Sequence, residues 1–235
     1  MSEELDKKRK NDAFLKMTYE TECEDRTSRN IYSLAIGLTV IFGLFFSYAV
    51  SLTALRSGML SNFTRGGLIV TIVVYLASSI GGNVIMNKTE KPAICIGGFA
   101  LMALGTGLLL TVLVAAYTAS SIANAFLITM GITAVMTLAA TAFPNAFLSM
   151  GKMLSLSLLA LIVIELVVTF IFRVQQQVTD YIVILIFTGF IGYDWALAQQ
   201  RPATITNAIR SAAAIYMDVI NILIRILSIV GKRRD

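Results

Sequence analysis

The sequence predicts an all-α membrane protein, a bundle of seven transmembrane helices with the last helix at its centre. The composition is 57% hydrophobic and only 14% charged, whereas soluble domains are nearer half apolar and a quarter charged. Apolar segments of spanning length recur along the chain after a polar start. The last of them carries a stripe of polar residues that lipid cannot solvate, so this helix should be surrounded by the others.

The chain divides into a charged N-terminal tail, residues 1–30, a transmembrane domain, residues 31–230, and a short basic end, residues 231–235. The tail mixes acidic and basic side chains, which is typical of a solvated cytosolic segment. It contains no apolar core of the kind found in secretory leaders, so we expect no cleavable signal peptide.

Apolar segments of about 17–25 residues follow the tail, and this is the length that a spanning helix needs. Their ranges are 31–55, 67–86, 93–117, 123–143, 153–172, 181–197 and 207–230. Polar or proline-containing loops separate them, at residues 56–66, 87–92, 118–122, 144–152, 173–180 and 199–202. The loop at 118–122 is uncharged, which predicts a tight hairpin. Small residues four apart, such as Ser78 and Gly82, predict close packing of the second and third segments.

The distribution of Lys and Arg favours a cytosolic N-terminus, because most of these residues near the membrane then lie on the inner side. Seven spans would place the C-terminus outside. The basic end, Lys232 to Arg234, suits the opposite side, and a re-entrant last segment would put both ends in the cytosol. Both alternatives stay open from the sequence.

Several functional classes are excluded by composition. The chain has no histidine and only two cysteines, Cys23 and Cys95, in no zinc-like spacing. The net charge of +5 lies in tails and loops rather than on one face, so no nucleic-acid partner is indicated. We therefore expect no cofactor and no enzymatic activity. The chain is expected to be a monomer in lipid; protons and Ca²⁺ are further expected partners, on the carboxylate chemistry and the family resemblance given below. A membrane-protein partner is an open alternative.

Carboxylates at membrane depth cost about 2.5–3.5 kcal/mol each, so each one needs a reason. Glu165, Asp194 and Asp218 lie inside apolar segments. With about 1.5 Å of rise per residue, Asp194 and Asp218 reach depths that differ by about 6 Å, which helix tilt can close. The short connection at 199–206 makes their helices neighbours. The sequence therefore predicts contact between the two aspartates, in the cytosolic half.

Two carboxylates in one apolar site cannot both ionise cheaply, so they titrate as a unit. A shared proton would join them and its loss would drive them apart, which makes the pair a proton sensor and gate without histidine. Ionised, the same oxygens suit Ca²⁺, as a weak and transient site. The alternative is that each aspartate pairs separately, for example Asp194 with Arg201.

Other polar residues of the last segment share the face of Asp218 and are expected to support it. They are Ser211, Asn221 and Arg225. Arg225 is also a candidate partner of Glu165, whose two interpretations are a structural ion pair and a point on an ion path.

Two stretches resemble a known family. Residues 187–194 read FTGFIGYD and residues 215–222 read IYMDVINI. They are similar to the closing motifs of the Bax inhibitor-1 family, in its bacterial form. The match is close over the last two segments and loose over the rest. Trp195 and Ala196 depart from the small polar pair that usually follows the first aspartate.

The resemblance implies a seven-helix bundle with a central last helix, and a Ca²⁺ leak regulated by pH through Asp194 and Asp218. Bacterial members can have an arginine that latches onto the first aspartate, and Lys88 is the candidate substitute here. Lysine lacks the planar fork of arginine, so the latch would be weaker. A bacterial plasma-membrane location follows from the same resemblance.

The sequence thus predicts a pH-sensitive calcium leak channel gated by a pair of aspartates. The alternative is a non-conducting regulatory membrane protein that acts through a partner, such as a protease or a stress or cell-death component. An aspartyl protease is disfavoured because the residues before Asp218 lack the required glycines. A proton-coupled transporter that uses Glu165 and Asp218 is the remaining alternative.

Overall fold

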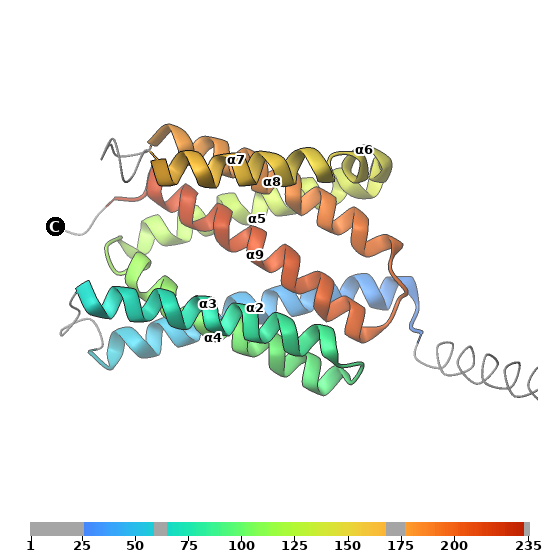
Figure 1. Ribbon diagram of the computed structural model, residues 1–235, viewed down its shortest axis with the longest axis horizontal. Coiled ribbons are helices and arrows are strands. Elements are labelled where there is room, and N and C mark those ends of the chain that lie inside the picture. The colour runs from blue at the N-terminus through green and yellow to red at the C-terminus, as the bar shows by residue number, and fades with distance from the viewer. Residues whose placement is uncertain (1–25, 59–64, 168–176, 233–235) are drawn as a thin grey trace, which may run out of the picture.

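The computed structural model describes residues 26–58, 65–167 and 177–232, and these residues form helices and connecting turns without a strand (Figure 1). The helices are α2 Arg29–Arg56, α3 Arg65–Lys88, α4 Pro92–Val114, α5 Ala119–Ala142, α6 Pro144–Ser149, α7 Gly151–Val167, α8 Gln177–Gln200 and α9 Ile205–Val230. The all-α prediction is confirmed.

Each predicted apolar segment corresponds to a helix, and α6 is an added short helix inside the 144–152 loop. Within the residues that the structure describes, six helices are long and apolar enough to cross a membrane, namely α2, α3, α4, α5, α8 and α9. The described part of α7 has 17 residues and ends at Val167. The rest of the predicted 153–172 segment lies outside the described residues.

The hairpin between α4 and α5 is as tight as predicted but lies earlier in the chain. α4 ends at Val114 rather than 117, and α5 begins at Ala119. The reason is a helix cap, because the Thr118 side chain accepts a hydrogen bond from the Ser121 backbone amide.

Small residues bring α3 and α4 into close contact. A Cβ on Gly82 would lie 2.4 Å from the Gly98 carbonyl oxygen, and one on Gly98 would lie 2.8 Å from the Gly82 carbonyl oxygen. Glycine at both positions lets the two backbones meet, which is how tightly packed membrane helices are built.

The helices form two groups, with α9 in contact with both. α2, α3 and α4 pack together, α5, α6, α7 and α8 pack together, and α9 packs against α2, α3, α4, α5 and α8. Figure 1 shows α9, in red, running obliquely between the two groups. Its Tyr216, Val219 and Ile222 are almost completely buried. Large apolar residues elsewhere are exposed, as Phe45 and Leu185 are, and this is the surface that lipid covers.

α9 runs the full length of the bundle. Its first residues contact the α3–α4 turn, where the Thr206 hydroxyl donates to the Glu90 carbonyl oxygen. Its end contacts the α4–α5 turn, where the Thr118 amide donates to the Lys232 carbonyl oxygen. α4 connects the same two turns, so α9 extends along the whole length of α4. Figure 1 accordingly shows the C-terminal end of α9 opposite the beginning of α2.

Candidate functional site

Asp194 of α8 and Asp218 of α9 lie together inside the bundle. Their carboxyl groups are in hydrogen-bonding contact with each other. Asp218 is only 6% exposed and Asp194 is half-buried. The structure therefore brings together the two aspartates that the sequence pairs, one from each of two consecutive antiparallel helices.

A short turn positions this pair. α8 ends at Gln200 and α9 begins at Ile205, because Pro202 interrupts the helix and Thr204 caps the next one. The Thr204 hydroxyl accepts a hydrogen bond of 3.2 Å from the Asn207 amide. Asp218 lies farther from the turn along its helix than Asp194 does. The oblique course of α9 (Figure 1) shortens its rise along the bundle, which allows the carboxyl groups to meet.

One oxygen of the pair is buried without a protein donor. Oδ2 of Asp218 is inaccessible to solvent and receives no hydrogen bond from the described part of the chain. Two ionised carboxylates can only accept hydrogen bonds, so neither can satisfy the other. A proton held between them supplies the missing donor and removes one of the two buried charges.

A basic residue lies on the turn side of the pair. The Arg201 guanidinium is close enough to attract the Asp194 carboxylate, and its Nη1 donates to the Ser211 hydroxyl over 3.3 Å. Arg201 is the basic residue that the sequence offered as an alternative partner for Asp194, but no ion pair within 4 Å joins the two side chains among the described residues. Its charge acts on Asp194 from a longer distance, while Asp218 is the closer neighbour.

The beginning of α2 fastens this turn. The Tyr32 hydroxyl donates to the Ala198 carbonyl oxygen over 3.0 Å and lies 3.3 Å from the Ser211 hydroxyl. Arg29 adds a hydrogen bond of 3.0 Å to the Arg201 carbonyl oxygen. Tyr32 is completely buried. Ser211, which the sequence assigns to the supporting face, is therefore linked to both Tyr32 and Arg201.

The remaining predicted residues near this end have different surroundings. Lys88, the candidate latch, is exposed at the end of α3. The basic side chain that contacts the α3–α4 turn is instead Arg210 of α9. Its guanidinium donates to the Met86 and Thr89 carbonyl oxygens and pairs with Glu90 at 2.9 Å. Arg210 thereby ties α9 to the turn that carries Lys88.

Asn221 bonds within its own helix. Its amide donates to the Met217 carbonyl oxygen over 2.8 Å. The side chain is half-buried on α9, one turn beyond Asp218, so it lies on the face that the sequence predicts.

A second charged cluster occupies the opposite end of α9. Arg225 pairs with Glu165 of α7 at 2.9 Å and with Asp180 of α8 at 2.7 Å. The Ser228 hydroxyl donates to the other Asp180 oxygen over 2.8 Å. The structure thus places Glu165 in an ion pair with Arg225, one of the two interpretations that the sequence allows. The cluster joins α7, α8 and α9.

Sequence reasoning missed Asp180 and Tyr32. Asp180 is 5% exposed, yet it was assigned to a loop because the apolar run begins at residue 181. Its place just before the apolar run was a usable signal for the beginning of a helix, since acidic residues are favoured in the first turn. Tyr32 stood at the beginning of an apolar run and gave no signal of its hydroxyl contacts.

The arrangement holds few groups that could bind a resident metal ion. Within the described residues, no cluster of three or more His, Cys, Asp or Glu side chains is present. Asp194 and Asp218 supply carboxylate oxygens from two residues only. Ca²⁺ prefers six to eight oxygen ligands, so these two side chains alone supply only part of a calcium coordination shell.

Comparison with known proteins gives the family. Residues 26–235 match the family described as inhibitor of apoptosis-promoting Bax1, Bax1-I. The chain is 27% identical to the inner membrane protein YbhL of Escherichia coli strain K12 over 197 residues, 80% of this chain and 83% of that protein. It is 29% identical to the uncharacterized protein RP147 of Rickettsia prowazekii over 138 residues, 55% of this chain and 58% of that protein. The resemblance seen in the two aspartate motifs is confirmed, and the chain belongs to the Bax1-I family of multi-pass membrane proteins.

Proposed function

We propose that the protein is a pH-sensitive leak channel for Ca²⁺ and similar cations, gated by Asp194 and Asp218. The observation that carries this proposal is the buried contact between these carboxyl groups on α8 and α9. In this proposal the protein acts without enzymatic chemistry and without a resident cofactor, and Ca²⁺ is the permeating ion. The working unit is a monomer in the bacterial plasma membrane, with the N-terminus in the cytosol.

The proposed channel is a bundle of seven spanning helices with α9 at its centre. α7 is the span added to the six long apolar helices. The contacts of α9 with both helix groups support this arrangement. Any separation of α8 from α9 then opens a gap between the groups rather than at the lipid surface. A path lined by backbone and polar side chains can exist there, because it is shielded from lipid.

The proton decides whether α8 and α9 stay in contact. With one proton shared, a hydrogen bond joins Asp194 to Asp218 and the pair carries a single negative charge. With the proton lost, two like charges face each other in a site of low dielectric constant, where repulsion is strong. The same ionised oxygens attract a hard cation. Proton loss therefore both weakens the helix contact and creates affinity for the ion.

Arg201 sets the balance between these states. Its positive charge lies near Asp194, so it favours the ionised form of that carboxylate and competes with the shared proton. Arg201 fills the role of latch better than Lys88 does, because Lys88 is exposed at the end of α3. Tyr32 and Arg29 hold the Arg201 turn in place.

Purified protein in liposomes tests the proposal. Vesicles that contain this chain and no other protein should release Ca²⁺ at a rate that depends on pH. Empty vesicles of the same lipid are the control. A rate equal to that of empty vesicles at every pH between about 5 and 8 would remove the channel from consideration.

The family description favours a second function, a non-conducting regulator of cell death or stress that acts through a partner. The charged tail, residues 1–30, is the candidate docking segment, and residues 1–25 of it lie outside the described structure. This function predicts no flux in pure liposomes and a loss of the cellular effect when residues 1–25 are deleted. The leak channel predicts that the flux survives this deletion.

A further inference from the structure

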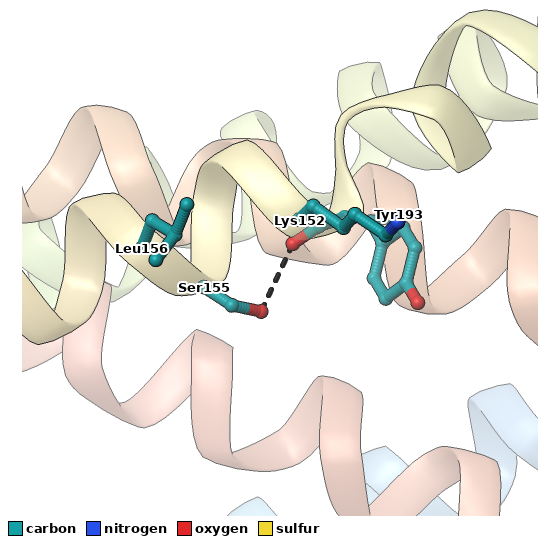
Figure 2. Close-up of a pocket in the computed structure, with 5 residues that line it drawn as sticks. Lys152, Ser155, Leu156 and Tyr193 are labelled. Atoms are coloured by element: carbon teal, nitrogen blue, oxygen red, sulfur yellow. Dashed lines mark hydrogen bonds between the residues drawn. The ribbon is translucent and has the colours of Figure 1, made fainter.

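A groove opens between the first turns of α7 and Tyr193 of α8. Gly151, Lys152, Ser155, Leu156 and Tyr193 line it, and its volume is about 440 Å³ (Figure 2). It lies where α7 begins, beside the last two turns of α8. This places it at the end of the bundle that also carries the α8–α9 turn.

The polar groups of the groove have unused hydrogen-bonding capacity. Lys152 is exposed, and within the described residues no carboxylate forms an ion pair with it. No described residue donates to or accepts from the Tyr193 hydroxyl in a hydrogen bond. The Ser155 hydroxyl donates to the Gly151 carbonyl oxygen over 2.9 Å, which leaves its lone pairs free. An ammonium and a phenol that face one groove form a site for an anion with several oxygens.

Gly151 makes room for this arrangement. A Cβ at this position would lie 2.5 Å from the Tyr193 ring. The absence of a side chain therefore lets the ring lie against the first turn of α7, beside Lys152. Figure 2 shows both side chains at the same edge of the groove.

An apolar strip leads from the groove along α7. Leu156, Leu159 and Val163 are 67%, 61% and 53% exposed. Their spacing places them on one face of the helix, below Lys152. An acyl chain is the partner that such a strip fits in a membrane.

The aromatic residues beside the groove are of the kind found at the depth of lipid headgroups. Tyr193 and Trp195 stand near the end of α8, and the Trp195 indole donates to the Thr141 hydroxyl over 2.8 Å. Tyr and Trp concentrate at the membrane interface, where a polar tip and an apolar ring are both satisfied. The same end carries Arg29 and Arg201, and basic membrane ends attract anionic lipids.

We propose that this groove is a binding site for one anionic glycerophospholipid, with its phosphate on Lys152 and Tyr193 and an acyl chain along α7. Charge complementarity selects the headgroup, and the apolar strip selects a lipid over a soluble phosphate. The site is distinct from the aspartate pair, because neither Asp194 nor Asp218 lines the groove.

Native mass spectrometry of the full-length protein tests this site. The probe is dioleoylphosphatidylglycerol, titrated against a constant excess of dioleoylphosphatidylcholine. One phosphatidylglycerol should bind more tightly than any phosphatidylcholine. Lys152→Gln should weaken it about fivefold, since a basic residue near anionic lipid contributes about that factor. Tyr193→Phe should weaken it by a similar factor, whereas Lys152→Arg should bind like the wild type.

Lys91→Gln is the matched control, because Lys91 is exposed at the same end and distant from the groove. Equal binding of the two lipids, or an equal loss in Lys91→Gln and Lys152→Gln, would overturn the site in favour of diffuse attraction. Complete displacement by millimolar glycerol 3-phosphate would overturn the lipid as its occupant. Retention of phosphatidylglycerol against that competitor supports the acyl-chain contact.

Discussion

Replacing Arg225 by methionine removes the positive charge that joins three helices at the end of the bundle remote from Asp218. Arg225 is bonded to Asp180 at 2.7 Å and to Glu165 at 2.9 Å. Methionine has a similar length and no charge, so it leaves both carboxylates in place and removes the arginine that pairs with each of them. Ser228 still donates to Asp180, which retains one hydrogen bond.

The loss of stability follows from burial. The Asp180 side chain is 6% exposed and the Glu165 side chain is 24% exposed. Removing one partner of a buried pair costs about 3–5 kcal/mol, because it strands the other charge. Glu165 reaches water in part and should contribute little. We expect a loss of about 3 kcal/mol, or about 9 °C in the unfolding temperature of a chain of this size.

A thiol-reactive fluorescent dye measures this change. Cys95 is completely buried in α4 and its thiol is free. In a Cys23→Ser background it is the only thiol in the sequence, so dye labelling on heating reports the unfolding of α4 and its neighbours. Arg225→Met should be labelled at a temperature about 9 °C lower.

The control neutralises the stranded acids. Adding Asp180→Asn and Glu165→Gln to Arg225→Met leaves no buried charge, and replacing all members of an ion pair is often nearly neutral. This triple variant should regain most of the lost stability. If Arg225→Met unfolds at the wild-type temperature, or if the triple variant is no better, the cluster does not act as an ionic clamp.

Two other predictions concern packing. Tyr32→Phe loses the hydrogen bond to the Ala198 carbonyl oxygen, which still accepts from the Arg201 backbone amide. The loss of one hydrogen bond costs about 0.5–1.5 kcal/mol, so the unfolding temperature should fall by about 2–5 °C in the same dye assay. An unchanged temperature would show that α2 does not fasten the α8–α9 turn. Gly82→Ala would place a Cβ 2.4 Å from the Gly98 carbonyl oxygen, which should cost about 1–3 kcal/mol. Gly97→Ala meets no atom within 4 Å and should unfold within a degree or two of the wild type; equal behaviour of these two variants would contradict the close backbone contact.

The sequence predicted the helices well, because membrane segments are specified by length and hydropathy over many residues. It also predicted that α8 lies beside Asp218, because the connection between α8 and α9 is too short to separate the two helices. It could bring Asp194 and Asp218 together for this reason, without knowledge of the remaining helices.

Contacts between distant segments could not be predicted in this way. Tyr32 meets Ala198 across more than half of the chain, and no local pattern records that meeting. Arg210 and Lys88 are both basic residues, and the sequence does not show which one bonds to the α3–α4 turn. The packing of α9 against that turn gives the hydrogen bonds to Arg210. Asp180 was missed because hydropathy begins a segment at its first apolar residue, whereas the helix begins earlier, at Gln177.

The most direct test of the central claim is the pH profile of Ca²⁺ flux in liposomes for the wild type, Asp194→Asn and Asp218→Asn. The account predicts that the wild-type rate changes with pH and that each asparagine variant has a nearly constant rate, because proton loss from the remaining carboxylate no longer sets two like charges against each other. Size-exclusion profiles and equal incorporation control for folding. A wild-type pH profile retained by both variants would contradict the assignment of the gate to this pair.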